Sequence, residues 1–173
     1  MAPTITKPRI LVTLLIALGI LGTGTIAIGA IAAHAARSPQ VPLTGSYSGT
    51  ATFTSATTVT FSGTGTSTLL GHSTNEGHIV VTGPDSSCPG GLANINNETL
   101  IAANGDSLMF SANDVACPVS PGVVHGTGQW VVTGGTGRFS GATGKGNIDG
   151  YGDFNQGVFS FQLIGTISTP KGG

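Results

Sequence analysis

The chain has 173 residues, only 8% of which are charged, and its formal net charge is −1. Six Lys and Arg residues, scattered along the chain, do not form the basic patch that nucleic acid phosphates require, so nucleic acid is excluded as a partner. With 29 glycines and many Ser and Thr residues, solubility depends mainly on uncharged polar side chains.

The N-terminal segment has the organisation of an export signal. Lys7 and Arg9 form a short basic region, residues 10–33 are uncharged and mostly apolar, and Ala33-His34-Ala35 forms an A-x-A cleavage site. Because roughly 20 apolar residues can span a bilayer, the alternative is an N-terminal anchor that stays in the membrane. Residues 1–35 are therefore predicted to be a signal peptide or a membrane anchor, and in either case the protein is expected to be secreted or extracytoplasmic.

A linker at residues 36–42, which contains two prolines, is expected to lead into one domain at residues 43–169, and residues 170–173 are an expected flexible tail. Within the domain, apolar residues or glycines alternate with Ser and Thr, most clearly over residues 46–54 and 159–167. This alternation indicates strands with one packed face and one hydroxyl-rich face. Frequent turn signals, and glycines on the packed face, favour strands that curve and close into an antiparallel β-barrel.

Three polar side chains, His72, Glu76 and His78, share one parity on a predicted strand. Histidine and glutamate can bind metals, but Ile79 and Val81 lie at the alternate positions of the same strand and are the residues expected to be buried. The three polar residues are therefore expected to face solvent. We predict neither a metal nor another cofactor for this chain.

An Asn104-Gly105 pair between two β-like runs predicts a hairpin with a two-residue type I′ turn, in which Ala103 lies opposite Asp106. In that register Cys88 and Cys117 lie near each other at the open end of the hairpin, and a bulge or loop after Cys88 would bring them within disulfide reach. Two cysteines in an exported domain most often form one structural bridge. We therefore predict a disulfide rather than a reactive thiol or half of a metal site.

The most distinctive segment is the glycine-rich run TGGTGRFSGATG at residues 133–144. Its glycines predict a compact structural turn in which Phe139 closes the end of a core and Arg138 faces a carboxylate, backbone carbonyls or water. The phosphate-loop pattern fails because Phe139 and Gly146 stand where it needs glycine and Ser or Thr, and no helix pattern follows. The residues assigned to this turn are Gly134, Gly135, Gly137, Arg138, Phe139 and Gly141.

Asp149 and Asp153 form a near pair of carboxylates among glycines. General acid and base catalysis would require the two carboxyl groups to have different environments, one of them desolvated. The surrounding glycines instead predict an exposed turn, where Asp is common for its local hydrogen bonds. We assign neither catalysis nor metal binding to this pair.

Three segments together resemble a known family: Leu70-Gly-His-Ser-Thr74, Leu100-Ile-Ala-Ala-Asn-Gly-Asp-Ser-Leu108 and the GGTGRFSGATG run. They are similar to bacterial secreted members of the allene oxide cyclase barrel-like group, which are relatives of dirigent proteins, over about residues 43–168. The resemblance implies an all-β fold, an antiparallel eight-stranded barrel of calycin type. It carries over no catalytic residue, because neither the cyclase's acid and water-binding groups nor a dirigent-type arginine and aspartate set can be matched to positions in this sequence.

An eight-stranded barrel either fills its interior with side chains or holds one small ligand. Trp130, Phe159 and Phe161 are expected inside such a barrel, where they pack in a core or line a ligand cavity. Glu98 shares the parity of Leu100 and is the ionisable group that we expect to point into the lumen.

Three functions stay open from the sequence. The first is an exported barrel that binds a small hydrophobic ligand or a surface partner. The second is a cyclase-like or dirigent-like enzyme that steers a reactive intermediate in the barrel, although no recognisable catalytic set identifies an enzyme. The third is a structural or adhesive envelope protein, and the resemblance to dirigent proteins, which often trimerise, makes a homo-oligomer an expectation.

Overall fold

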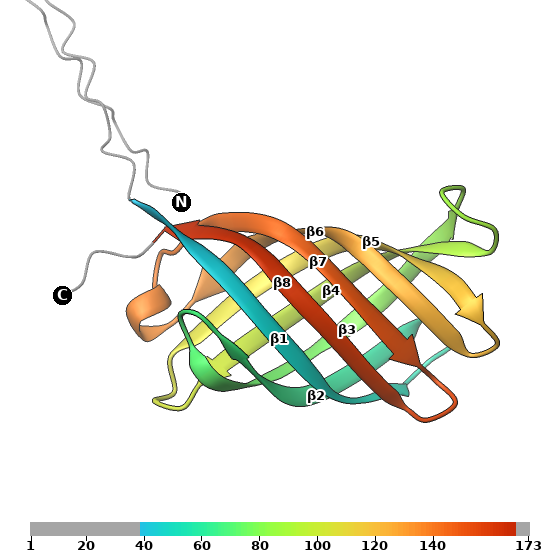
Figure 1. Cartoon of the computed structure of the whole chain (residues 1–173), viewed down its shortest axis with the longest axis horizontal. Coiled ribbons are helices and arrows are strands. Elements are labelled where there is room, and N and C mark those ends of the chain that lie inside the picture. The colour runs from blue at the N-terminus through green and yellow to red at the C-terminus, as the bar shows by residue number, and fades with distance from the viewer. Residues whose placement is uncertain (1–38, 169–173) are drawn as a thin grey trace, which may run out of the picture. The chain divides into compact units, whose positions relative to one another are not determined.

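Eight antiparallel strands form one closed barrel within residues 39–168, the part of the chain that the computed structural model describes (Figure 1). Each strand pairs with the next along the chain, and β8 closes the sheet on β1. The strands are β1 (Gln40–Phe53), β2 (Thr58–Ser67), β3 (Gly71–Asp85), β4 (Gly91–Ala102), β5 (Ser107–Ser120), β6 (Val123–Gly135), β7 (Gly144–Asp153) and β8 (Val158–Ser168). The predicted antiparallel eight-stranded β-barrel is confirmed, whereas the predicted signal peptide or anchor at residues 1–35 and the tail at 170–173 lie outside the described residues.

Buried and exposed positions alternate along the strands. On β8, Phe161, Leu163 and Ile167 are buried, and Gln162, Ile164 and Thr166 on the other face are exposed. Residues at alternate positions point to opposite faces of a sheet, so closing the sheet places one set in the lumen and the other outside. Within residues 39–168, no helix is long and apolar enough to cross a membrane.

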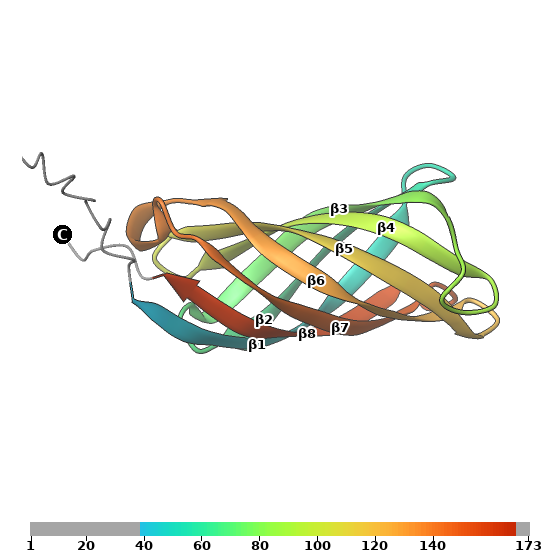
Figure 2. The ribbon, with the colours of Figure 1, turned by 90° about the horizontal axis from the view of Figure 1, so that it is seen from above.

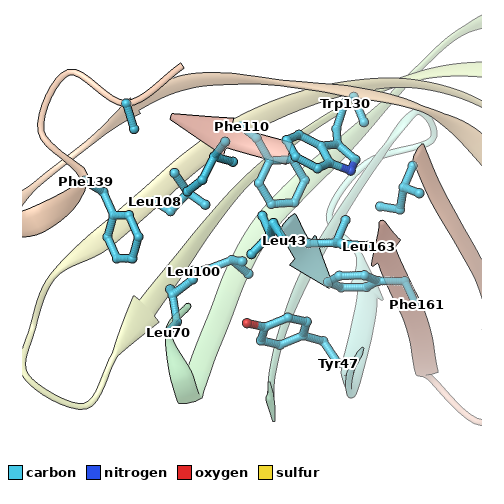
Figure 3. Packing of buried hydrophobic residues seen from close by; sticks show 14 of the residues in the cluster. Leu43, Tyr47, Leu70, Leu100, Leu108, Phe110, Trp130, Phe139, Phe161 and Leu163 are labelled. Atoms are coloured by element: carbon cyan, nitrogen blue, oxygen red, sulfur yellow. The ribbon is translucent and has the colours of Figure 1, made fainter. Parts of the chain in front are cut away.

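One half of the lumen is filled by side chains (Figure 3). It is the half toward the β2–β3, β4–β5 and β6–β7 connections, where β1 begins and β8 ends (Figures 1 and 2). The members of this core that are at most 1% exposed are Leu43, Leu100, Leu108, Phe110, Ala112, Trp130, Leu163 and Ile167. Gly146 and Gly165 pair across β7 and β8, and a Cβ atom on either would lie 2.5 Å from Cζ2 of Trp130, so these inward glycines make room for the indole.

The glycine-rich loop covers the end of this filled half. Its short 3₁₀ helix η1 (Gly137–Phe139) places the Phe139 ring in the core, where the residue is 3% exposed. Thr136 N donates a hydrogen bond to Ser107 O at 2.8 Å, which ties the loop to β5. Arg138 lies outside, with its Nε 3.5 Å from Asp106 Oδ2 and its guanidinium carbon 5.0 Å from the centre of the Phe139 ring.

The predicted disulfide between Cys88 and Cys117 is confirmed, with 6.0 Å between the two Cα atoms. Cys88 lies in the β3–β4 connection, where Gly91 N donates to Cys88 O at 3.0 Å and Gly90 has a φ of 73°. Cys117 lies on β5. The bridge therefore fixes the β3–β4 loop to β5 at the barrel end opposite Phe139.

The β4–β5 hairpin differs by one residue from its predicted register. Ile101 pairs with Ser107, so Ala103 is not opposite Asp106, and the predicted two-residue type I′ turn is wrong. Ala102 N donates to Asp106 O, Gly105 N donates to Ala102 O, and Gly105 has a φ of 86°. A three-residue loop with glycine in the left-handed region also suits the twist of the two strands, and Asn104 stabilises it by hydrogen bonds with Asp106.

Strand β1 begins at Gln40, before the predicted start of the domain at residue 43. Pro42, which was expected in the linker, pairs with Thr166 of β8. Proline is tolerated there because β1 pairs with β2 only from Gly45 onward, so Pro42 lies where one side of the strand is unpaired.

We expect Phe139→Ala to lower the free energy of unfolding by about 3–5 kcal/mol, because it removes a buried ring from the end of the core. Arg138→Ala is the matched control, with an expected loss below about 1 kcal/mol, since its ion pair with Asp106 is exposed. Urea unfolding followed by the fluorescence of Trp130 measures both. Equal losses in the two variants would contradict a structural role for the Phe139 ring.

Replacing both cysteines with alanine should lower the free energy of unfolding by about 3.5 kcal/mol, because the bridge closes a loop with a sequence separation of 29 residues. Urea unfolding with and without a reductant is the measurement. The wild-type protein should become as unstable as the variant after full reduction, and the variant should not respond to the reductant. A fully reduced wild-type protein of unchanged stability would contradict this expectation.

Candidate functional site

The other half of the lumen contains a cavity of about 440 Å³. Its walls come from strand positions near the β1–β2, β3–β4, β5–β6 and β7–β8 connections, so it lies at the end of the barrel opposite Phe139. The main apolar side chains that line it are Ala51, Val59, Phe61, Ile79, Phe154 and Phe159. Phe53 is 51% exposed and packs against Phe154 with 4.7 Å between ring centres, which gives the cavity an aromatic rim.

One wall of the lumen is a continuous row of aromatic rings. Phe61 contacts Phe159 with 5.3 Å between ring centres, and Phe159 stacks on Phe161 at 5.9 Å. Phe161 in turn stacks on Tyr47 at 5.3 Å, as the labelled pair in Figure 3 shows. Offset and tilted rings at these distances attract one another beyond the area that they bury. The row therefore connects the cavity to the filled core.

The opposite wall carries a row of polar side chains from β3, β4 and β5. Strand β4 presents Asn94, Asn96 and Glu98 at successive inward positions, each at most 6% exposed. Asp114 of β5 pairs with Asn94, whose Nδ2 donates to Asp114 Oδ2 at 3.4 Å. Asn75 of β3 donates from its Nδ2 to Glu98 Oε1 at 3.2 Å. Asn94, Asn96 and Asp114 line the cavity, and Asn75 and Glu98 continue the row toward the filled half.

Four buried oxygen atoms of this polar row have no hydrogen-bonding partner among the described residues. They are Asn75 Oδ1, Asn96 Oδ1, Glu98 Oε2 and Asp114 Oδ1. Buried polar atoms are nearly always hydrogen-bonded, because an unsatisfied one costs about 1–3 kcal/mol. All four atoms are acceptors when the carboxyl groups are ionised, so the wall is complementary to a molecule that donates hydrogen bonds.

Burial raises the pKa of both carboxyl groups in the lumen. Burial raises the pKa of Glu98 well above its ordinary value, and the hydrogen bond from Asn75 only partly opposes this effect. Burial also raises the pKa of Asp114 to about 6, against the hydrogen bonds from Asn94 and from its own backbone. Glu98 therefore stays a neutral acid to a higher pH than an ordinary glutamate, and Asp114 likewise becomes ionised only around pH 6.

The four residues predicted to line a ligand cavity lie in different parts of the lumen. Phe159 and Phe161 lie on the wall of the cavity, and Glu98 is buried in the lumen at 3% exposure. Trp130 belongs to the filled core, where it packs against Phe110 and donates from Nε1 to Asn147 O at 3.0 Å. Trp130 therefore fills the lumen rather than lining the open space.

Sequence reasoning missed Asn75, Asn94, Asn96 and Asp114. The two asparagines on β4 share the parity of Glu98 and Leu100, and this signal alone could have identified them. Asp114 was missed because the predicted hairpin register would place it on the other face from Asn94. The apolar parity of Leu108, Phe110 and Ala112 on β5 would have corrected that register.

The remaining ionisable groups that were considered lie on the outer surface. His72, Glu76 and His78 are exposed on β3, and within residues 39–168 no three potential ligand side chains are grouped to hold a metal ion. Asp149 is not in a turn, as was expected, but lies within β7, where its Oδ2 is 3.1 Å from His125 Nε2. Asp153 does stabilise a turn, because its Oδ1 accepts hydrogen bonds from the backbone of Asn155 and Gln156.

Comparison of the sequence with models of known protein families gives no match, and comparison with curated proteins also gives none. The class of this protein is therefore defined by its fold, a closed antiparallel β-barrel of eight strands. One half of its lumen contains a cavity, with aromatic rings on one wall and acidic and amide side chains on the other.

We expect Asp114→Asn to change how stability depends on pH. The folded state binds a proton at Asp114 more tightly than the unfolded chain does, since the pKa rises from 3.8 to about 6. The wild-type free energy of unfolding should therefore fall, relative to the variant, by on the order of 2–3 kcal/mol as the pH rises from about 4 to above 6. Urea unfolding at a series of pH values measures this difference, and a difference that stays constant over this range would contradict burial of an ionisable Asp114.

Proposed function

We propose that the protein is an exported β-barrel that binds one small, largely apolar molecule in its lumen. The observation that carries this proposal is the cavity of about 440 Å³ with Phe61, Phe159 and Phe161 on its wall. Small-molecule sites are typically concave and mostly apolar, with a few polar groups that fix the orientation of the ligand. An eight-stranded barrel is also of the size that encloses one such ligand.

The disulfide supports the extracytoplasmic part of the proposal. Bonds such as Cys88–Cys117 form and persist in oxidising compartments and are rare in the cytosol. The export-signal pattern of residues 1–35 points the same way. We further propose that the chain is related to the allene oxide cyclase barrel-like, dirigent-related group, on the sequence resemblance described above.

A second candidate function, an enzyme that steers a reactive intermediate inside the barrel, is favoured by Glu98. A buried carboxyl group with a raised pKa and an oxygen without a partner can donate or accept a proton. Analysis by mass spectrometry of any molecule that copurifies with the protein would distinguish the two functions. Release of the molecule unchanged indicates a carrier, whereas its conversion by the wild type but not by Glu98→Gln indicates an enzyme.

Ala116→Trp should abolish binding of a neutral apolar probe, because Ala116 lines the cavity and an indole there would occupy it. The matched control is Asn113→Trp, which adds the same side chain at an exposed position on the same strand. Titration with N-phenyl-1-naphthylamine, whose fluorescence increases in apolar surroundings, measures the affinity. We expect at least a tenfold loss for the first variant and wild-type affinity for the second.

Thermal unfolding of both variants shows whether they are folded. The proposal would be overturned if the wild type does not bind the probe, or if a folded Ala116→Trp variant binds it as tightly as the wild type does.

A further inference from the structure

We infer that the ligand of the lumen is an organic cation, an amine with an apolar body, whose ammonium group binds Asp114 and Asn96. This inference deepens the proposed function and rests on it. It names the chemical class of the ligand and assigns a binding role to two side chains on neighbouring strands.

The first step of the argument is the position of two unpaired acceptors. Asp114 and Asn96 both line the cavity, and each has one buried oxygen without a hydrogen-bonding partner among the described residues. Asn96 is only 6% exposed, so its free oxygen is not simply solvated at the surface. Asn94 pairs with Asp114 and donates to its other carboxyl oxygen, which holds the carboxyl group in place with Oδ1 free.

The second step is the number of hydrogen bonds that each class of ligand can donate. An alkylammonium group carries up to three N–H donors and no acceptor, so one group can satisfy both free oxygens. A single alcohol has one O–H donor and would leave one of them unpaired. Since a buried acceptor left without a hydrogen bond destabilises the complex, the wall discriminates in favour of the amine.

The third step is the sign of the charge. The lumen carries the carboxyl groups of Asp114 and Glu98. Residues 39–168 contain one Arg and one Lys, and both lie outside the lumen. Arg138 covers the outer side of Phe139 at the other end of the barrel, and Lys145 is exposed on β7. A ligand carboxylate would therefore meet a like charge without a compensating cation, whereas an ammonium group would form an ion pair with Asp114.

The fourth step is the wall opposite Asp114 and Asn96. Strand β8 lies four strands from β4 in the closed barrel, so Phe159 and Phe161 face the polar row across the lumen. These rings contribute apolar area for the body of the ligand. Their faces are also negative, which favours a cation over an anion in the same space.

The test uses three probes that share one apolar body and differ in charge: 1-naphthylmethylamine, 1-naphthalenemethanol and 1-naphthoic acid. Each is titrated at pH 7.5 into wild-type protein, Asp114→Asn and Glu76→Gln, with binding followed by calorimetry. Glu76→Gln is the matched control, because it removes one carboxyl group from the exposed outer face. We expect the wild type and the control to bind the amine at least tenfold more tightly than the alcohol, and the acid most weakly.

In Asp114→Asn the preference for the amine over the alcohol should disappear, since the amide carries no charge to pair with the ammonium group. Equal binding of amine and alcohol by the wild type, or an amine preference that survives in Asp114→Asn, would overturn the assignment of a cationic ligand. Binding of the alcohol in either case leaves the proposed function intact. If the wild-type protein binds none of the three probes and does not bind the neutral dye, the proposed function itself fails.

Discussion

Closure of the sheet is the constraint on which the rest of this structure depends. Eight strands enclose a lumen just wide enough for side chains to fill, so each large inward residue needs small ones around it. Trp130 fits because Gly146 and Gly165 leave its indole space, and Tyr47 similarly lies where a Cβ on Gly65 would clash with its ring. The glycines therefore determine where the lumen is filled. In the other half, alanine and glycine positions face space that no indole or leucine occupies, and the cavity results.

Burial of the polar row lowers the stability of the fold, whereas burial of the aromatic row does not. Asn75, Asn96 and Glu98 are buried with oxygen atoms that find no partner among the described residues, although apolar side chains of similar size would pack without this cost. The same burial raises the pKa of both Glu98 and Asp114, because desolvation disfavours their charged forms. A lumen built only for stability would not need these groups. Their place on one wall, opposite the rings, is the arrangement on which the proposed ligand binding rests.

The two ends of the barrel are built differently. At the filled end, the glycine-rich loop inserts Phe139 into the core and is tied to β5 through Ser107. At the cavity end, the disulfide fixes the β3–β4 loop to β5 without placing a side chain into the lumen core. The glycine-rich segment that looks most like a ligand loop in the sequence therefore has a structural role, and the candidate site lies at the opposite end.

The sequence by itself determined which residues could share a face. Period-two alternation identified the strands, placed Glu98 with Leu100, and put Phe159 and Phe161 inside, because side-chain direction in a strand depends only on parity. The predicted hairpin at Asn104-Gly105 also placed Cys88 and Cys117 near each other. The tertiary structure decided how β4 and β5 align: a three-residue loop in place of the expected two-residue turn shifts β5 by one residue, and this shift brings Asp114 onto the same face as Asn94. A shift of one residue moves every side chain of a strand to the opposite face of the sheet. The acidic wall of the cavity therefore depends on the register between β4 and β5. Packing and turn geometry set this register, and alternation within a single strand does not.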